Sequence, residues 1–546
     1  MMDFVFLFYS SAMHDKVIIG CRDFLIRMLP KKLRVLYLHL IERPLELVTS
    51  LCVLSFIVLF IFQGASGSAS LSDDASQNLR SAFNLFSTGE YGEFRLGVPG
   101  FRREPLPNFI TAFYIKSFVW QAHELNFSSL RSAQDVLDQI VRVNLLWAFG
   151  LYVSLWCLCR QLFRPSWIAN IIAAFAIYGS DSVFVAYEYR NLNTELQASC
   201  LLVVFISLSL IFYRSSSLWM ALPVGFLAGL VILTKASGIY VFPIAFLPLA
   251  LLFSKRLKLP GLLSKRFTRY LAVLVVLYLS TSLTVLPWMM RNKIEFNEVT
   301  ISQGGGRILW IRSEFNKMNS NEYFGSFYAY SPGFLQVSVF EDLLGFKEAQ
   351  LECGGSLQSL NRNLLCDRQS LDSGNLSQVR SFYQRGKRVR PALVKTAYKR
   401  EGLAFDNDDV GKKFGINSIM NNPVKHFVVT LPIAWRGLWS FKDESFGGVL
   451  INFIGMFGLV AILPVFGLLR YSDEWLVISL IPTGYFWFYA FLSHFRTRYS
   501  EPLIPLSFIA LFLLLTALLS TSRKHFKSVS GTTMNRAFRH QSNFED

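Results

Sequence analysis

The chain has 546 residues, of which 52% are hydrophobic and only 17% are charged, and its formal net charge at pH 7 is +17. Water-soluble proteins usually keep about a quarter of their residues charged, so this composition is typical of a membrane protein, although only the arrangement of the apolar residues excludes a large soluble core. The basic excess alone could indicate nucleic-acid binding, but its distribution along the chain, described below, fits a membrane protein, and we predict no nucleic-acid partner.

The apolar residues fall into ten blocks, most of them close to the roughly 20 residues that a helix needs to cross the hydrocarbon core. We therefore predict an all-α polytopic membrane protein with about ten or more transmembrane helices. The ten blocks are 47–62, 141–162, 167–185, 196–213, 218–233, 239–253, 270–289, 449–469, 475–492 and 503–519.

Basic residues gather before the first block, in the loop that precedes residue 270, and after the last block. With ten spans, all three clusters lie on one side, and the positive-inside rule makes that side the cytoplasm. Both termini are therefore predicted to be cytoplasmic. The predicted organisation is a basic interfacial arm (1–46), a transmembrane module (47–290), an outer domain (291–447), C-terminal transmembrane helices (448–520) and a basic tail (521–546).

Two long segments face outward in this topology, the first outer loop (64–140) and the outer domain, for which we expect an α/β or irregular structure. Cys353 and Cys366 both lie in the outer domain. They can form a disulfide in an oxidising compartment or remain two unpaired thiols. Because no CxxC pair, HExxH or other zinc-ligand spacing occurs, no metal site is predicted.

The first outer loop carries the residues best suited to chemistry. Asp73 and Asp74 follow the first span directly, where they could act as helix caps in the first turn of a helix. Sugar transfer from a lipid phosphate needs a base for the acceptor hydroxyl and cations for the departing phosphate. Asp73, together with Arg102, Arg103 and Arg291, meets these demands at the mouth of the bundle.

Several motifs of the chain resemble the GT-C glycosyltransferases, in the branch of bacterial protein O-mannosyltransferases and lipid A aminoarabinose transferases. They occur in the same order as in that branch, from about residue 47 to 519. The motifs are Asp73-Asp74, Gly89-Glu90-Tyr91, Arg103-Glu104-Pro105-Leu106-Pro107, Asn193-Thr194-Glu195, Pro287-Trp288-Met289-Met290-Arg291-Asn292 and Arg498-Tyr499-Ser500-Glu501-Pro502.

The resemblance implies a GT-C fold and an inverting glycosyltransferase that uses a polyprenyl-phosphate sugar donor. It assigns the catalytic role to Asp73, with Asp74 as the second acid, and phosphate binding to Arg498. The aminoarabinose transferases have Glu-Lys-Pro where this chain has Arg103-Glu104-Pro105, so Arg102 or Arg103 would replace the lysine that contacts phosphate, and the case for aminoarabinose as the sugar is weaker. The acceptor can be a glycan, a lipid or a protein, and the expected location is the bacterial inner membrane.

The remaining candidates have plain structural explanations as well. Tyr91, Glu104 and Tyr189 are weaker candidates for a substrate cleft. Glu195 is attributed to helix capping and Lys235 to anchoring at the interface. No cofactor is obligatory, although a carboxylate pair can also bind a divalent cation. The main alternative function is a transporter or a lipid or oligosaccharide flippase, which would explain the spans equally well.

Overall fold

The computed structural model describes residues 44–215, 217–257, 265–401, 406–441, 445–469 and 472–519. Within these ranges the chain is almost entirely helical and contains no β-strand. The predictions made for the N-terminal arm, apart from residues 44–46, and for the basic tail lie outside the described residues.

Eight helices in the described part are long and apolar enough to cross a membrane, which confirms the predicted all-helical, multi-pass architecture. They are Pro44–Ala65, Gln134–Leu162, Ser166–Glu188, Glu195–Arg214, Arg266–Phe296, Phe446–Leu468, Asp473–Leu492 and Glu501–Leu519. The two remaining predicted spans correspond to shorter apolar helices, Leu218–Thr234 and Gly238–Ser254.

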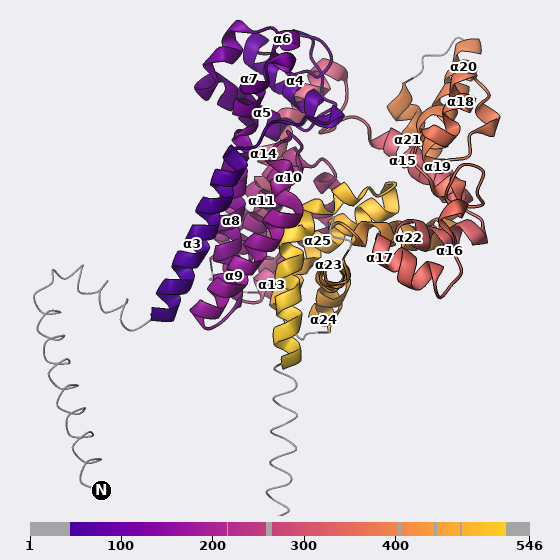
Figure 1. The fold of residues 1–546 in the computed structure, drawn as a ribbon. Helices are drawn as coiled ribbons and strands as arrows, with labels where there is room; N and C mark the ends of the chain where they lie inside the picture. Colours follow the sequence, from indigo (N-terminus) through magenta and orange to yellow (C-terminus); the bar gives the residue numbers. More distant parts are fainter. Residues whose placement is uncertain are drawn as a thin grey trace, which may run out of the picture.

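The helices differ in how much apolar surface they bury inside the protein. In α3 (Pro44–Ala65), only 17% of the apolar window is buried, and the helix lies at the edge of the bundle (Figure 1). In α11 (Glu195–Arg214), 83% is buried. Both helices are apolar on all sides, so their sequences do not show whether lipid or protein covers them. The positions of the neighbouring helices decide this.

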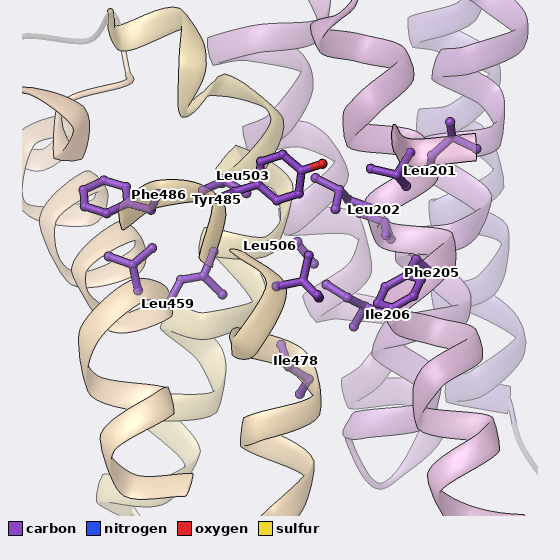
Figure 2. Packing of buried hydrophobic residues seen from close by; sticks show 14 of the residues in the cluster. Leu201, Leu202, Phe205, Ile206, Leu459, Ile478, Tyr485, Phe486, Leu503 and Leu506 are labelled. Atoms are coloured by element: carbon purple, nitrogen blue, oxygen red, sulfur yellow. The ribbon is translucent and has the colours of Figure 1, made fainter. Parts of the chain in front are cut away.

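α11 packs against helices from the far end of the sequence. Figure 2 shows Leu202, Phe205 and Ile206 of α11 facing Ile478 and Leu506 from the C-terminal spans. These contacts join segments more than 270 residues apart in the sequence, and together the two groups of helices form one apolar core that carries the outer segments at one end.

Three ion pairs lie at the opposite end of the bundle and connect the ends of different spans. They are Arg160–Glu46 at 2.6 Å, Arg214–Glu474 at 2.8 Å and Lys255–Asp473 at 2.8 Å. If ten spans alternate in direction, the end of every even-numbered span lies on the same side as the start of every odd-numbered span. Each of the three ion pairs joins one end of each kind, as this topology predicts.

The first outer loop forms a small helical cap on the bundle (Figure 1). It contains α4 (Asp73–Thr88), α5 (Pro105–Phe118), α6 (Phe127–Ser132) and α7 (Gln134–Val141). Its apolar core includes Leu79, Phe83, Ile115, Leu130 and Ile140, all buried. This core is continuous with the start of the second span and fixes α4 at the outer end of the bundle.

The outer domain is helical in its described part, so the expectation of α/β structure there is wrong. Its longer helices are α15 (Gly305–Glu314), α16 (Ser320–Ala329), α18 (Leu365–Asp372), α20 (Arg390–Arg400), α21 (Asn407–Met420) and α22 (Pro423–Leu438). Short helices and irregular turns connect them because the sequence is rich in polar and turn-forming residues. Cys353, in one of these turns, forms a disulfide with Cys366 in the first turn of α18, and their Cα atoms are 5.1 Å apart.

Candidate functional site

The N-terminus of α4 is held by the segment of chain that directly precedes α11. Ser72 is the N-cap residue, and its hydroxyl oxygen accepts a hydrogen bond from the backbone N–H of Ala75 at 3.3 Å. The Ser72 hydroxyl also donates to the Asn193 side-chain oxygen at 3.1 Å, and Asn78 donates to the Leu192 carbonyl at 2.7 Å. The cap is therefore Ser72, and the two aspartates occupy the first turn beyond it.

Asp74 lies between two arginines that come from distant parts of the chain. One carboxylate oxygen pairs with Arg103 of the same outer loop, and the other accepts from Nη2 of Arg498 at 2.7 Å. Gln77, one turn along α4, accepts from Nε of Arg103 at 3.1 Å. Burial alone would raise the pKa of Asp74, but the Arg103 and Arg498 guanidiniums hold that pKa well below its usual range. Asp74 is therefore ionised and fully engaged.

Asp73 is exposed, and among the described residues it has no hydrogen-bond or ion-pair partner for its carboxylate. Successive residues of a helix point about 100° apart, so the two aspartates face different directions although they are adjacent. The structure thus separates the pair into one carboxylate that is held by cations and one that is available to solvent or substrate.

The network continues from Arg498 into the bundle. Nε of Arg498 lies 3.0 Å from Oε1 of Glu195, and Nζ of Lys235 lies 2.9 Å from the same oxygen. The Glu195 side chain is 1% exposed. Helix capping, to which we attributed Glu195, does not account for it, because its carboxylate binds two cations.

Glu195 and Lys235 are connected to the site through Arg498, and the sequence did not predict that they pair with each other. Each is an ionisable residue at the edge of an apolar block, which is a signal for function in a membrane protein. Their pairing with each other, 40 residues apart, has no signature in the sequence.

Arg102 and Arg103 are neighbours with different surroundings. The Arg102 guanidinium lies over the Phe94 ring, 5.8 Å from its centroid. No carboxylate of the described residues forms an ion pair with Arg102, whereas Arg103 pairs with Asp74. Burial, with Arg103 and Arg307 nearby, lowers the pKa of Arg102. Arg102 is therefore a cation with remaining capacity to bind an anion.

Arg291 holds the outer loop through backbone carbonyls. Its guanidinium donates to the carbonyls of Gly100 at 2.8 Å and Tyr91 at 3.1 Å, and it lies over the Trp288 ring, 4.9 Å from the centroid. Arg291 thus fixes the loop with Nη1 and one N–H of Nη2, while Nε and the second N–H of Nη2 have no hydrogen-bond partner among the described residues.

The tyrosines proposed for a cleft are buried and hydrogen-bonded. The Tyr91 hydroxyl lies 3.0 Å from the carbonyls of Arg103 and Glu104 and accepts from Asn108 at 2.7 Å. Glu104 is the N-cap residue of α5, without a side-chain capping bond. The Tyr189 hydroxyl lies 2.9 Å from that of Tyr152. These contacts fix the outer loop and the end of a span.

In the part of the chain that the structure describes, no three His, Cys, Asp or Glu side chains are grouped so that they could hold a metal ion. Both oxygens of Asp74 already bind arginines, so a cation at the aspartate pair would rely on Asp73. The arrangement can therefore act through an exposed carboxylate beside fixed guanidiniums.

Comparisons with known proteins give a distant similarity. No family model and no curated protein matches the sequence. Among solved structures, the chain is similar to the oligosaccharyltransferase of Archaeoglobus fulgidus in complex with Zn and sulfate, with 13% identity and a TM-score of 0.43 over 88% of this chain and 50% of that chain.

A second similar structure is the archaeal oligosaccharyltransferase AglB from Archaeoglobus fulgidus in complex with an inhibitory peptide and a dolichol-phosphate. Its identity is also 13%, and its TM-score is 0.44 over 87% of this chain and 52% of that chain. The chain thus spans about half the length of these structures. At this identity and these TM-scores, the similarities assign neither a family nor an activity to this chain.

Proposed function

We propose that the chain is an inverting glycosyltransferase that moves a sugar from a polyprenyl-phosphate donor to an acceptor hydroxyl on the non-cytoplasmic face of the membrane. The proposal rests on two adjacent carboxylates that have different surroundings at the N-terminus of α4. Asp73 is an exposed carboxylate, and the adjacent Asp74 holds Arg103 and Arg498 in place. A base beside fixed cations is what displacement of a phosphate requires.

The proposed reaction is a single displacement at the anomeric carbon. Asp73 takes the proton of the acceptor hydroxyl as its oxygen forms a bond to the anomeric carbon from the face opposite the phosphate. The bond between that carbon and the phosphate oxygen breaks, and the phosphate keeps the electron pair. The products are the glycosylated acceptor, with inverted configuration, and polyprenyl phosphate.

The arginines stabilise the negative charge that develops on the departing phosphate. Arg102 has no carboxylate partner among the described residues, and Arg103 and Arg498 are oriented by Asp74 and Gln77. Each guanidinium is already held in position, so it loses little conformational freedom when it binds the phosphate. Its interaction with the charge that develops in the transition state is therefore stronger than the interaction of a mobile lysine would be. Arg291 acts by positioning the loop through the carbonyls of Gly100 and Tyr91.

The donor is proposed to be a lipid phosphate because the site lies at the outer mouth of a bundle of apolar helices. The acceptor is a glycan, a lipid or a protein, and the membrane is the bacterial inner membrane with both termini in the cytoplasm. No metal is needed in this scheme. The alternative of a transporter or flippase draws on the buried Glu195–Lys235 pair, since intramembrane charges often mark transport pathways.

The test compares membranes that contain the parent chain, Asp73→Asn or Asp135→Asn. Asp135 is an exposed acid in the first turn of α7, in the same outer loop, and serves as the matched control. A polyprenyl-phosphate sugar extract and host envelope acceptors are supplied, and free polyprenyl phosphate is measured by mass spectrometry. We expect release by the parent and by Asp135→Asn, and a loss of about 100-fold or more in Asp73→Asn.

Equal release by Asp73→Asn and the parent would remove Asp73 from the mechanism. If the parent releases no carrier across a broad donor panel, but moves labelled donor between the leaflets of a vesicle, the flippase alternative replaces the transferase.

A further inference from the structure

A second group of cations lies close to the first site but shares no residue with it. Arg496 and Arg498 flank Thr497 at η12 (Thr497–Tyr499) and pair in different directions. Arg498 binds Asp74, whereas Nη2 of Arg496 donates to the Tyr383 hydroxyl at 2.9 Å. Thus one short turn contributes a cation to each of two sites.

Three further cations gather around Tyr383 and Tyr330. The Arg362 guanidinium lies 4.2 Å from the Tyr383 ring centroid, and Nζ of Lys387 lies 5.4 Å from it. The Arg436 guanidinium lies 4.7 Å from the Tyr330 centroid. We call Arg362, Lys387, Arg436 and Arg496 the tyrosine-centred basic cluster. Its members come from the outer domain and from the connection between the last two spans.

The cluster has no counter-ion in the described ranges of the chain, where no Asp or Glu forms an ion pair with any of its four members. This contrasts with the other cationic group of the outer domain, in which Lys317, Arg385 and Arg390 all pair with Glu314. Four like charges held together without an acid repel one another, so an isolated cluster of this kind costs stability.

Its electrostatic field acts on the neighbouring side chains. Burial would raise the pKa of Tyr383, but Arg496, Lys387 and Arg362 bring that pKa below its ordinary value. Burial lowers the pKa of Arg362 to about 10, with Arg436 and Arg496 adding to the effect. Burial and the same cations hold the pKa of His494 well below its ordinary value, so this buried histidine is neutral and adds no charge.

Several buried donors of the cluster also lack partners. Nε of Arg362 and Nη1 of Arg436 are buried and form no hydrogen bond with the described residues. The neutral His494 ring, whose centroid lies 5.3 Å from that of Tyr383, has no hydrogen-bond partner among the described residues at either nitrogen, and one of the two is an N–H donor. Buried polar groups are almost always hydrogen-bonded, and each unsatisfied one costs about 1–3 kcal/mol. Unpaired N–H donors beside unpaired cations are the features that an anionic ligand would satisfy together.

We propose that the tyrosine-centred basic cluster is a second anion-binding site that takes a phosphoryl group. Planar guanidiniums offer paired donors that match phosphate oxygens, and three of the four cations are arginines. The anion would bind between the outer domain and the bundle, next to the turn that carries Arg498. In the proposed transferase it is either the phosphate of the lipid carrier or a phosphate that the acceptor carries, and only this choice of source rests on the proposed function.

Binding is tested without turnover, so its outcome is independent of whether sugar transfer occurs. The full chain in lipid nanodiscs is titrated with inorganic phosphate at constant ionic strength, by calorimetry and by thermal unfolding. The variants are Arg362→Gln and Arg436→Gln. The controls are Arg388→Gln, an exposed arginine beside the cluster, and Arg103→Gln, which alters only the first site.

We expect the parent and both controls to show a phosphate-binding component that Arg362→Gln and Arg436→Gln weaken about tenfold or more, the usual effect of removing a charge-assisted hydrogen bond. Without phosphate, the two cluster variants should melt no lower than the parent, because each substitution relieves repulsion. Superimposable isotherms for the parent and Arg436→Gln would overturn the proposal, and so would a parent that binds no phosphate.

Competition by farnesyl phosphate identifies the source of the anion. If farnesyl phosphate occupies the cluster at concentrations at least tenfold lower than inorganic phosphate does, the site takes the phosphate of the lipid carrier. Equal potency assigns the site to a phosphate that has no prenyl chain. Both results retain the anion site.

Discussion

Asp73 and Asp74 are adjacent in sequence but differ in what surrounds their carboxylates. Asp74 binds Arg103 and Arg498, and Asp73 is exposed. The difference arises from the angle between successive helical side chains, which directs only one of the two toward the cations. The exposed acid can therefore exchange a proton, while its neighbour keeps the arginines in position.

The contribution of Asp74 to stability should depend on pH. Its pKa in the folded protein lies below the unfolded value, so its stabilising effect is fully present above roughly pH 4 and is lost as the pH falls toward the folded pKa. We expect Asp74→Asn to melt below the parent at pH 7, with a difference that narrows below about pH 4. Thermal unfolding in detergent across pH 3–8 measures this, and a difference that stays constant with pH would contradict it.

Glu195 should tolerate substitution less well than its partner Lys235. Removing Glu195 leaves Lys235, whose side chain is only 12% exposed, without its carboxylate, and breaking a buried ion pair from one side usually costs about 3–5 kcal/mol. Removing Lys235 leaves Glu195 with Arg498. The melting temperature should therefore fall in the order parent, Lys235→Met, Glu195→Gln.

The double variant Glu195→Gln/Lys235→Met provides the control for this ordering. It should melt above Glu195→Gln, because no unpaired lysine remains. A double variant that melts at the sum of the two single losses would show that the ion pair is not the cause.

Among the elements, α15 and α21 depend on glycine for their contact. A Cβ atom added at Gly306 would lie 1.9 Å from the carbonyl oxygen of Asp408, far inside contact distance. The Asp408 carboxylate also accepts from the backbone N–H of Gly304 and Arg307, both at 3.1 Å, and so satisfies donors at the start of α15. Close backbone approach and helix capping thus occur at the same place.

Gly306→Ala should therefore destabilise the outer domain, by about 1–3 kcal/mol as overpacking usually does. Gly305→Ala is the matched control, because a Cβ at Gly305 meets no atom within 4 Å. Hydrogen exchange of residues 305–314 measures the effect locally. Equal protection in the two variants would show that the helices can separate at no cost.

The Cys353–Cys366 disulfide closes a short loop within the outer domain, with a sequence separation of 13 residues. Cross-links that close loops of this length stabilise by about 3 kcal/mol in the chain-entropy model. Cys353→Ser/Cys366→Ser should lower the melting temperature of the outer domain and increase its proteolysis, while Cys52→Ser, which removes a free cysteine, should not. Equal protease resistance would show that packing alone holds the loop.

At the scale of the whole molecule, the ten-span count gives both termini the same side. The structure places Glu46, Arg160, Arg214, Lys255 and Asp473 in ion pairs at one end of the bundle and Asp73 at the other. The distribution of basic residues predicts that the first end is cytoplasmic.

The orientation can be measured with single cysteines in a chain that keeps no other exposed thiol. A membrane-impermeant maleimide added to intact cells should label Ser373→Cys in the outer domain and spare Ser217→Cys in the loop after α11; both residues are exposed. Permeabilised cells should label both. The reverse pattern in intact cells would invert the topology and place the proposed site in the cytoplasm.

The amino-acid sequence by itself determined the spans and indicated a helix that begins beside Asp73, because these follow from hydrophobicity and capping within short windows; the distribution of basic residues predicted their side. It also indicated Asp73, Asp74, Arg103 and Arg498 as members of one site through their motifs. It did not indicate that Arg291 is engaged with backbone carbonyls or that the outer domain is helical.

Only the tertiary structure decided which charges meet. Asp74 and Arg498 are 424 positions apart, and Arg436 reaches Tyr330 across more than 100 residues. The strength of an ion pair depends on distance and burial, and a sequence records neither for residues on different helices. The folding of α11 against the C-terminal spans therefore joined Glu195, Arg498 and Lys235 into one network.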